Sequence, residues 1–245
     1  MNIYITDGTE ESFYTAAFTA CTDAGCLVCS AREIQLCIDA ALIRVAPDEE
    51  KCGRVKRKLT LCDPHCLRDI SLLLRRGWEG REQLALEYLR MIVKVRAPVR
   101  DRLADKTVLA VRENCRKVTG EAHNFTGFLR FMEGEGGILY APFAPDNDIL
   151  ELILPHFLRR LPAQPFIIHD TARKKAALYN GTACLISPAD ERVSVALSER
   201  EDAFRSLWQE YYDAVNIDMR PHERQMRGYM PARYWKFMPE KNIKR

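Results

Sequence analysis

Residues 121–181 read EAHNFTGFLRFMEGEGGILYAPFAPDNDILELILPHFLRRLPAQPFIIHDTARKKAALYNG, and their pattern decides the fold. Two apolar segments with strand character, Phe128–Met132 and Ile138–Phe143, flank EGEGG, a glycine-bearing loop of hairpin length. A helix opened by Asp146 or Asp148 comes next, and the apolar segments PFIIHD and AALYNG then indicate further strands. The stretch therefore predicts a hairpin followed by a helix and more strands.

Upstream of this stretch the apolar positions repeat mainly with helical period. Thr9 and Asp105 each precede such a repeat, and both are residue types that cap helix N-termini. Pro47-Asp48-Glu49-Glu50 has the form of a helix first turn, with carboxylates at the positive end of the helix dipole. Asn2–Thr6 alternates weakly, as an edge strand would, and Leu42–Val45 is a second strand candidate. We therefore predict an α+β fold, with a mainly antiparallel sheet of four or five strands packed by helices and a helix-rich N-terminal half.

Glycines mark the one break in the pattern that suggests a domain boundary. The length of 245 residues suits one large domain or two small ones. Gly77 and Gly80 bracket the break, so we expect an N-terminal region of residues 1–80 and an α+β core domain of residues 81–245.

The segments after residue 181 predict one more strand and one more helix. The strand is indicated by Thr182–Ile186, and Ser198-x-x-Glu201 has the form of a capping box at the start of an amphipathic helix. The tail from residue 220 onward is basic and aromatic and shows little periodicity.

Composition excludes several classes of protein. Hydrophobic residues make up 47% and charged residues 29% of the chain, which is ordinary for a globular protein. No apolar run reaches the roughly 18 to 20 residues of a membrane span. The sequence MNIYITDGTEES lacks the basic start and apolar core of a secretory signal, so we expect a cytoplasmic location.

Charge is strongly segregated along the chain. Residues 51–130 carry a net charge of +10 and residues 220–245 of +6, whereas residues 1–50 carry −7 and residues 131–219 carry −6. A polarised surface of this kind suits an anionic partner such as nucleic acid. The alternative is that these charges lie on solvated helix faces.

Nine cysteines in a chain without a secretory signal are better interpreted as free thiols or metal ligands than as a disulfide framework. Cys21, Cys26, Cys29 and Cys62 resemble the plant-type ferredoxin spacing for a two-iron, two-sulfur cluster. Cys26, Cys29, Cys62 and Cys66 form an alternative zinc set. Because Cys21 falls in a helical stretch and the spacing exceeds that of zinc ribbons, we predict no cofactor and no metal.

Three histidines of the central stretch are candidates for acid–base chemistry. His169 is followed by Asp170, which could orient the imidazole only if the backbone bends, because neighbours on a strand point to opposite faces. His156 lies on the apolar stripe of its predicted helix, where a hydrogen-bonded core histidine is the common case. The candidate catalytic residues are therefore His123, His169 and Asp170, and His156 is a further candidate for the same cleft.

Arginines surround these histidines in the sequence and recur beside aromatic residues in the tail. Guanidinium groups bind phosphates through paired hydrogen bonds, and aromatic rings stack on unpaired bases. This chemistry makes a set of residues candidates for contact with single-stranded or flipped-out nucleic acid: Arg130, Arg160, Arg173, Arg233, Tyr234 and Trp235. The alternative is that Tyr234 and Trp235 dock the tail onto the core while the arginines are solvated.

We place Arg130 on the same strand face as Phe128 and Met132.

Four segments also carry a family resemblance: IYITDGTEESFYTAAFTA, EAHNFTGFLRF, LYAPFAPDNDILELILPHFLRRLPAQPFIIHDTAR and MPARYWKFMPE. In these segments the chain resembles a bacterial domain-of-unknown-function family described as DNA metabolism or DNA repair proteins. Members of that family are encoded beside a radical-SAM protein, and in some lineages the domain is fused to a uracil-DNA glycosylase superfamily domain. The resemblance spans nearly the whole chain and is strongest from about residue 82 onward.

The family pattern matches most of the candidate residues and departs at one turn. Family members carry an asparagine in the stretch that corresponds to Arg220-Pro221-His222, which contains none here. The cysteines are not part of the pattern. The matching positions are Glu121-Ala122-His123, Gly127-Phe128, Arg130-Phe131, His156-Phe157, Arg160, Asp170, Arg173 and Met230-Pro231-x-Arg233-Tyr234-Trp235.

The resemblance and the residues together suggest three functions. The first is a DNA-binding accessory protein that holds damaged or single-stranded DNA for a radical-SAM or glycosylase-type partner. The second is an enzyme acting on DNA or a nucleotide, with His123 and His169 as acid and base and with Arg130 and Arg173 binding phosphate. The third is a protein-only adaptor for the radical-SAM partner.

Overall fold

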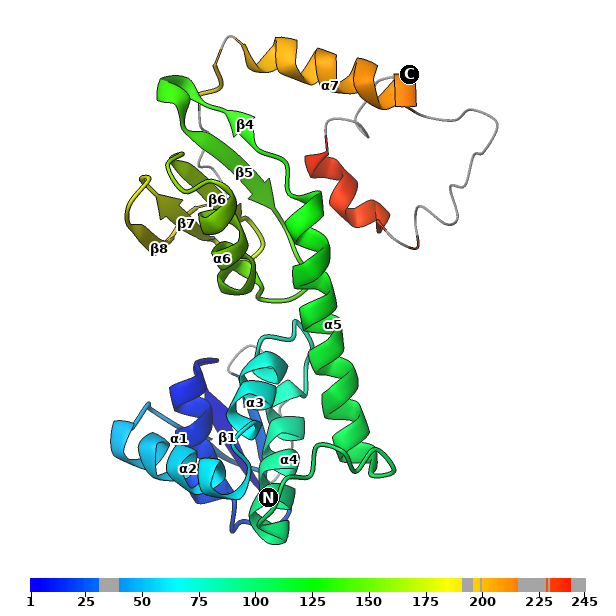
Figure 1. The fold of residues 1–245 in the computed structure, drawn as a ribbon. Coiled ribbons are helices and arrows are strands. Elements are labelled where there is room, and N and C mark those ends of the chain that lie inside the picture. Colours follow the sequence, from blue (N-terminus) through cyan, green and yellow to red (C-terminus); the bar gives the residue numbers. More distant parts are fainter. Residues whose placement is uncertain (31–39, 191–195, 199, 216–227, 229, 239–245) are drawn as a thin grey trace. The chain divides into compact units, whose positions relative to one another are not determined.

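The computed structural model describes residues 1–30, 40–190, 196–198, 200–215, 228 and 230–238. The chain divides into two compact units, Met1–Gly120 and Glu121–Arg245 (Figure 1). The boundary that we predicted at residues 77–80 falls in the turn before a helix, and it stays a prediction. No helix of the described part is long and apolar enough to span a bilayer.

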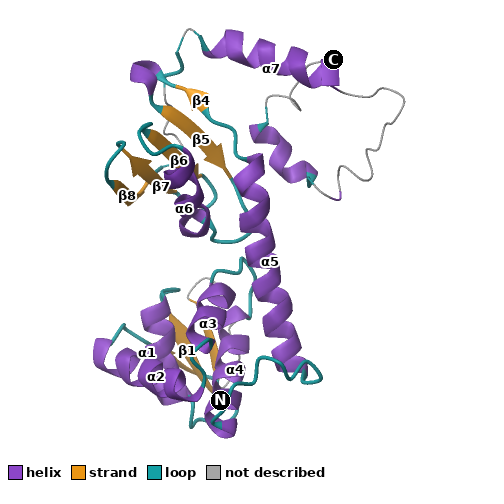
Figure 2. Cartoon of the chain, in the orientation of Figure 1, coloured by secondary structure: helices purple, strands orange, loops and turns teal. Residues whose placement is uncertain are grey.

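The N-terminal unit is a small parallel sheet packed by helices, and Figure 2 shows how helix-rich it is. β1 (Asn2–Thr6) is its central strand, between β2 (Leu27–Ser30) and β3 (Ala41–Arg44). The expected edge position of Asn2–Thr6 was therefore wrong. Residues 3–5 are almost fully buried, because a central parallel strand is covered on both faces. The helices of this unit are α1 (Glu10–Ala20), α2 (Glu49–Cys62), α3 (Cys66–Leu74) and α4 (Arg81–Val95).

The predicted caps Thr9 and Asp105 are confirmed, and the helix start predicted at residues 47–50 is confirmed with Asp48 as its cap. The Thr9 hydroxyl accepts a hydrogen bond from the backbone of Ser12 at the start of α1, and Asp48 accepts one from Lys51 at the start of α2. Asp105 accepts from the amide of Thr107 at 2.8 Å, where α5 (Lys106–Phe128) begins. Short polar side chains satisfy the unpaired amides of a first turn, which explains why these positions were recognisable.

The C-terminal unit is built on a five-stranded mixed sheet in the order β4-β5-β6-β7-β8. β5 and β6 run parallel, and the other neighbouring pairs are antiparallel. This arrangement confirms the α+β prediction with its mainly antiparallel sheet. The strands are β4 (Met132–Glu133), β5 (Leu139–Phe143), β6 (Phe166–Asp170), β7 (Lys175–Tyr179) and β8 (Cys184–Pro188).

Helical elements connect and flank this sheet. The crossover between β5 and β6 is α6 (Leu150–Arg160), which packs against β7 (Figure 1). α7 (Glu201–Val215) follows β8, and the short 3-10 helix η2 (Ala232–Phe237) packs against β5. A 3-10 turn, η1 (Glu135–Gly137), joins β4 to β5, and the φ angles of 74° at Gly136 and 77° at Gly137 suit glycine.

The predicted strand Phe128–Met132 was wrong, because α5 runs through Phe128 and only Met132–Glu133 forms a strand. The apolar residues Val118, Ala122, Phe125 and Leu129 continue the helical stripe of α5, and all four are buried. The packing of this stripe outweighs the strand character of the sequence. Arg130 therefore lies in the connection between α5 and β4 and not on a strand face.

Two predicted caps were also wrong. Neither Asp146 nor Asp148 caps α6, whose N-cap is Ile149; Asp148 instead forms an ion pair of 2.6 Å with Lys175. The Ser198–Glu201 pair does not form a capping box. Glu201 accepts a hydrogen bond of 2.7 Å from the amide of Glu133, so this carboxylate ties the start of α7 to β4.

No disulfide bond links the cysteines that the structure describes. They include both cysteine sets that we considered as metal sites. Among the residues that the structure describes, no group of three or more His, Cys, Asp or Glu side chains could hold a metal ion.

Candidate functional site

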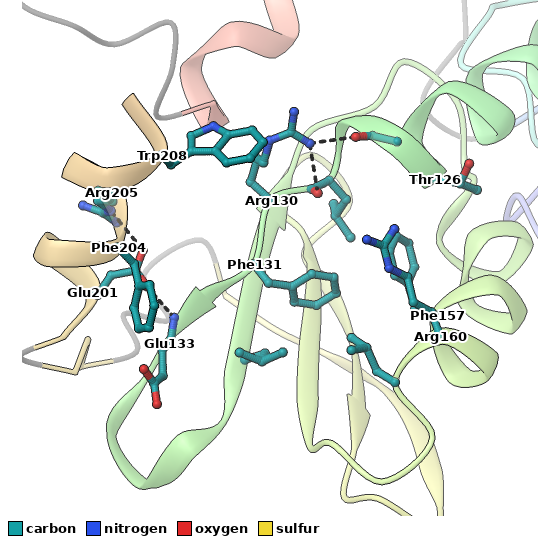
Figure 3. Close-up of a pocket in the computed structure, with 14 residues that line it drawn as sticks. Thr126, Arg130, Phe131, Glu133, Phe157, Arg160, Glu201, Phe204, Arg205 and Trp208 are labelled. Atoms are coloured by element: carbon teal, nitrogen blue, oxygen red, sulfur yellow. Dashed lines mark hydrogen bonds and ion pairs between the residues drawn. The ribbon is translucent and has the colours of Figure 1, made fainter. Parts of the chain in front are cut away.

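A cavity of about 760 Å³ lies in the C-terminal unit (Figure 3). Its walls come from the end of α5, the connection to β4, the start of β5, the end of α6 and the first two turns of α7. Two of the predicted binding residues, Arg130 and Arg160, line this cavity. Its volume lies within the range of roughly 300–1,000 Å³ that small-molecule sites occupy.

An aromatic side chain from the α5–β4 connection forms the floor of the cavity. Phe131 packs edge-on against Phe157 of α6, with ring centroids 5.3 Å apart, and against Phe166 of β6 at 5.9 Å. Because Phe157 and Phe166 are buried in the core, Phe131 is held by the sheet and by α6 together. The floor is therefore rigidly supported and apolar.

The wall nearest α7 combines a cation with an indole ring. The guanidinium carbon of Arg130 lies 5.5 Å from the ring centroid of Trp208, which is a cation–π distance. The guanidinium of Arg130 also donates a hydrogen bond of 2.7 Å from Nη1 to the carbonyl oxygen of Gly127, which anchors it to the last turn of α5. Trp208 is 39% exposed, and part of its ring remains available to a ligand.

A second cation lies on the opposite side of the cavity (Figure 3). Arg160 is the last residue of α6, where the carboxyl end of the helix dipole favours a positive charge. Its side chain is exposed and has no hydrogen-bond or ion-pair partner among the residues described. Arg160 can therefore bind an anion without breaking an existing contact.

The two carboxylates that line the cavity are already engaged. Glu201 is buried and pairs with Arg205 at 3.1 Å while it accepts from the amide of Glu133. Glu133 itself accepts a hydrogen bond of 3.3 Å from the hydroxyl of Ser198. These contacts stabilise the junction of α7 with β4.

A buried polar network holds the loop between β5 and α6. Glu121, only 7% exposed, accepts hydrogen bonds from the amide of Asp146 at 2.7 Å and from the amide of Asn147 at 2.9 Å. The side-chain amide of Asn147 donates a further bond of 2.6 Å to it, and the hydroxyl of Tyr234 also donates to it. Burial and the contact with the Glu121 carboxylate raise the pKa of Tyr234, which therefore stays a phenol.

Two of the predicted phosphate-binding arginines hold the same loop. Arg173 donates to the carbonyl oxygen of Pro145 at 3.0 Å and of Asp146 at 2.7 Å, and it pairs with Asp170 at 3.2 Å. Arg233 forms an ion pair of 2.6 Å with Asp146. These contacts give both arginines a structural role; contact with nucleic acid stays a prediction for them.

The tail segment around Tyr234 docks onto the core. The ring of Tyr234 lies 4.7 Å from that of Phe125, edge-on, and its hydroxyl accepts from Arg233 at 3.1 Å. The indole nitrogen of Trp235 donates to the carbonyl oxygen of Met230 at 3.0 Å. For Tyr234, these contacts agree with the alternative that the aromatic residues of the tail dock it onto the core.

The turn Arg220-Pro221-His222 lies outside the described residues.

The three histidines of the central stretch occupy separate places, and none of them lines the cavity. His123 is exposed on α5, and His156 lies edge-on to Phe157 at 5.0 Å. His169 is fully buried on β6, where its Nδ1 lies 2.8 Å from the hydroxyl of Tyr140. Burial lowers the pKa of His169, which keeps the ring neutral near pH 7.

Asp170 is buried beside His169 and belongs to the loop network. Its Oδ1 accepts from the amides of Ala172 and Arg173, both at 3.1 Å. Burial raises the pKa of Asp170, against the opposing effect of Arg173. An acid–base pair of His123 with His169 has no support in this geometry and stays a prediction.

The site also includes residues that were not among the sequence candidates, above all Phe131, Arg205 and Trp208. Phe131 was recognised only as part of the family pattern. Trp208 belongs to an apolar repeat that indicates a buried helix face, and no sequence signal shows that this face is exposed. Arg205 has the i,i+4 relation to Glu201 that could have marked their ion pair.

Comparison with known proteins identifies a family match. Residues 79–240 match the family described as a domain of unknown function, DUF4130. No curated protein and no solved structure matches the chain.

Proposed function

The chain belongs to the DUF4130 family, and from its cavity we propose that it is a DNA-binding accessory protein that holds an unpaired nucleotide. One observation carries the proposal: the Arg130–Trp208 pair and Arg160 lie on opposite sides of a cavity whose floor is Phe131. Rings and cations arranged in this way suit a base and its flanking phosphates.

The chemistry of the walls favours a nucleotide over an uncharged ligand. Aromatic faces stack on any base, and each such contact contributes roughly 1–3 kcal/mol. Guanidinium groups bind phosphate oxygens through paired hydrogen bonds. Since the cavity is concave and of nucleotide size, it suits single-stranded DNA or a base flipped out of a duplex better than an intact double helix.

The resemblance to DNA metabolism and repair proteins adds detail to this proposal. It implies that the bound DNA is damaged or single-stranded and that a radical-SAM or glycosylase-type partner carries out the chemistry. The described cysteines are joined by no disulfide, which suits a reducing compartment such as the cytoplasm.

A direct test compares two neighbouring arginines. Arg160 lines the cavity, whereas the adjacent Arg159 is exposed on the same turn of α6 and does not. We expect Arg160→Ala to weaken binding of a fluorescent single-stranded oligonucleotide by about tenfold, which corresponds to about 1.4 kcal/mol. Arg159→Ala should change the affinity by no more than about twofold, because it removes the same charge outside the cavity.

Fluorescence anisotropy at low salt provides the measurement, with single-stranded DNA, a matched duplex and a duplex containing a mismatch as ligands. The proposal predicts the order single strand, then mismatch, then matched duplex, because unpairing a base costs free energy. Equal losses in Arg159→Ala and Arg160→Ala, or no binding to any of the three ligands, would contradict it.

A protein-binding adaptor is the second candidate, and one observation favours it. The apolar stripe of α7 is exposed, with Leu207 at 62% and Tyr211 at 58% exposure. Apolar side chains gathered on one exposed helix face are typical of protein contacts. Co-purification of the radical-SAM partner that Leu207→Lys abolishes, in a protein that binds no DNA, would favour this candidate over the first.

A further inference from the structure

A second cavity, of about 410 Å³, lies in the N-terminal unit. It is formed by the C-terminal half of α1, the middle of α2 and the second half of α4. Ala17, Leu59 and Leu89 are buried at its base, and Val55 and Val93 add apolar surface. α1 and α2 precede residue 79, so most of this cavity lies outside the part of the chain that matches the family.

The charged residues that line this cavity are all cations. Arg54, Arg57 and Lys58 lie on one face of α2, at the helical spacing of three and four residues. The guanidinium carbon of Arg54 is 4.9 Å from the ring centroid of Phe18, which also lines the cavity. None of the lining residues is acidic, so nothing in the cavity wall neutralises the three positive charges.

We propose that this cavity binds a small oxyanion that carries a compact apolar group, such as an aryl phosphate or carboxylate. The apolar base removes the hydrocarbon part of such a ligand from water, and the cationic rim pairs with its oxygens. An inorganic anion would leave the apolar base uncovered, and a neutral apolar molecule would leave the cations without a partner. The volume suits a molecule of this class.

Phenyl phosphate is the probe that tests the proposal, in a ¹H–¹⁵N NMR titration of the full chain. We expect saturable shifts of amides in the segments around Ala17, Leu59 and Leu89. Inorganic phosphate lacks the ring and benzyl alcohol lacks the charge, so each should bind at least about tenfold more weakly. Benzyl alcohol binding as tightly as phenyl phosphate would overturn the role of the cations.

Variants on α2 locate the anion. Arg54→Gln combined with Lys58→Gln should weaken phenyl phosphate binding by about tenfold or more, because the variant removes two of the three cations that line the cavity. Lys51→Gln is the matched control, since Lys51 lies on the same helix but outside the cavity, and it should leave the affinity within about twofold of the original value. Unchanged binding in the double variant, or no saturable shift in the original protein, would overturn the proposal.

A single-stranded oligonucleotide distinguishes this site from the DNA site proposed above. If the oligonucleotide leaves the amides around Ala17, Leu59 and Leu89 unmoved, the site takes a small molecule as proposed. If the oligonucleotide displaces phenyl phosphate, DNA phosphates are its ligand and the small-molecule assignment falls. Either result is independent of the Arg160 and Arg159 comparison, because those residues lie in the other unit.

Discussion

Glu121 shows how one buried carboxylate organises a loop and a distant tail. It accepts from the backbone of Asp146 and Asn147 and from the hydroxyl of Tyr234, which lies 113 residues away in the sequence. A buried carboxylate is tolerated when several donors satisfy it. Because the carboxylate and its donors satisfy one another, the loss of Glu121 would leave buried donors without an acceptor.

We predict that Glu121→Ala destabilises the protein by at least about 2 kcal/mol, since it leaves several donors unsatisfied in the interior. Tyr234→Phe removes one of the four hydrogen bonds to Glu121, together with the bond from Arg233, and should cost about 1 kcal/mol. Urea unfolding followed by circular dichroism measures both variants. Equal losses in the two variants would show that the network does not depend on Glu121.

His169 gives a pH prediction. Burial lowers its pKa below the ordinary value of 6.5, so the unfolded chain takes up a proton at a pH at which the folded protein does not. The stability contributed by the neutral ring is therefore complete above the unfolded pKa and declines as the pH falls below it. We expect the free energy of unfolding to decrease from pH 7.5 toward pH 5.5.

The variant His169→Asn isolates this effect. It should flatten the decline over the same pH range, because asparagine does not titrate there. Asp170 acts in the opposite direction, since burial raises its pKa above 3.8 and a lower pH favours its buried neutral form. Asp170 is present in both the original protein and His169→Asn, so comparing the two removes its contribution. If the free energy of unfolding declined equally with pH in both proteins, the prediction would be contradicted.

At the scale of elements, the junction of α5 with β4 creates the cavity. α5 ends at Phe128, and the next three residues contribute Leu129 to the buried stripe and Arg130 and Phe131 to the cavity. Had the strand begun at Phe128, strand alternation would have sent Arg130 and Phe131 to opposite faces. The length of α5 therefore decides that both side chains line one cavity.

The aromatic cluster around Phe125 keeps this junction in place. Phe125 is 2% exposed and packs edge-on against Phe143, at 5.2 Å between ring centroids, and against Tyr234. We expect Phe125→Ala to lower the free energy of unfolding by about 3–5 kcal/mol, through lost burial and a residual void. Phe128→Ala, one turn later and only partly buried, should cost clearly less in the same denaturant titration. A loss in Phe128→Ala as large as that in Phe125→Ala would contradict this assignment.

At the scale of the whole molecule, a small net charge hides two strongly basic segments. The chain has a formal net charge of +3, although residues 51–130 alone carry +10. A protein that neutralises phosphates releases bound counterions, so its affinity for DNA falls steeply as salt rises. Segregated charge, rather than net charge, governs this behaviour.

Salt dependence tests whether Arg160 contacts a phosphate. A plot of log affinity against log salt concentration for single-stranded DNA should have a negative slope, and Arg160→Ala should reduce its magnitude by about one. Arg159→Ala should leave the slope unchanged. Anisotropy titrations at several sodium chloride concentrations give these slopes, and parallel lines for the original protein and Arg160→Ala would argue against a phosphate contact.

Local sequence determined the α+β class, the capped helix starts and most strands of the C-terminal sheet. These features depend on contacts within a few residues, such as Asp105 with the amide of Thr107 or the apolar period of α5. The same local reasoning failed at Phe128–Met132, where a helical stripe and strand character compete and only packing decides. It also failed at Glu201, whose carboxylate reaches β4 and not its own helix terminus.

Residue chemistry in the sequence also identified Arg130 and Arg160 as binding candidates, but it could not separate them from Arg173 and Arg233. All four are arginines beside aromatic or acidic residues. Only the tertiary structure shows that Arg173 and Arg233 hold the loop at Asp146, while Arg130 and Arg160 line one cavity with Trp208. The physical reason is that distance in space, which sequence spacing does not specify, decides whether a cation lies beside the carbonyl and carboxylate oxygens of a loop or in the wall of a cavity.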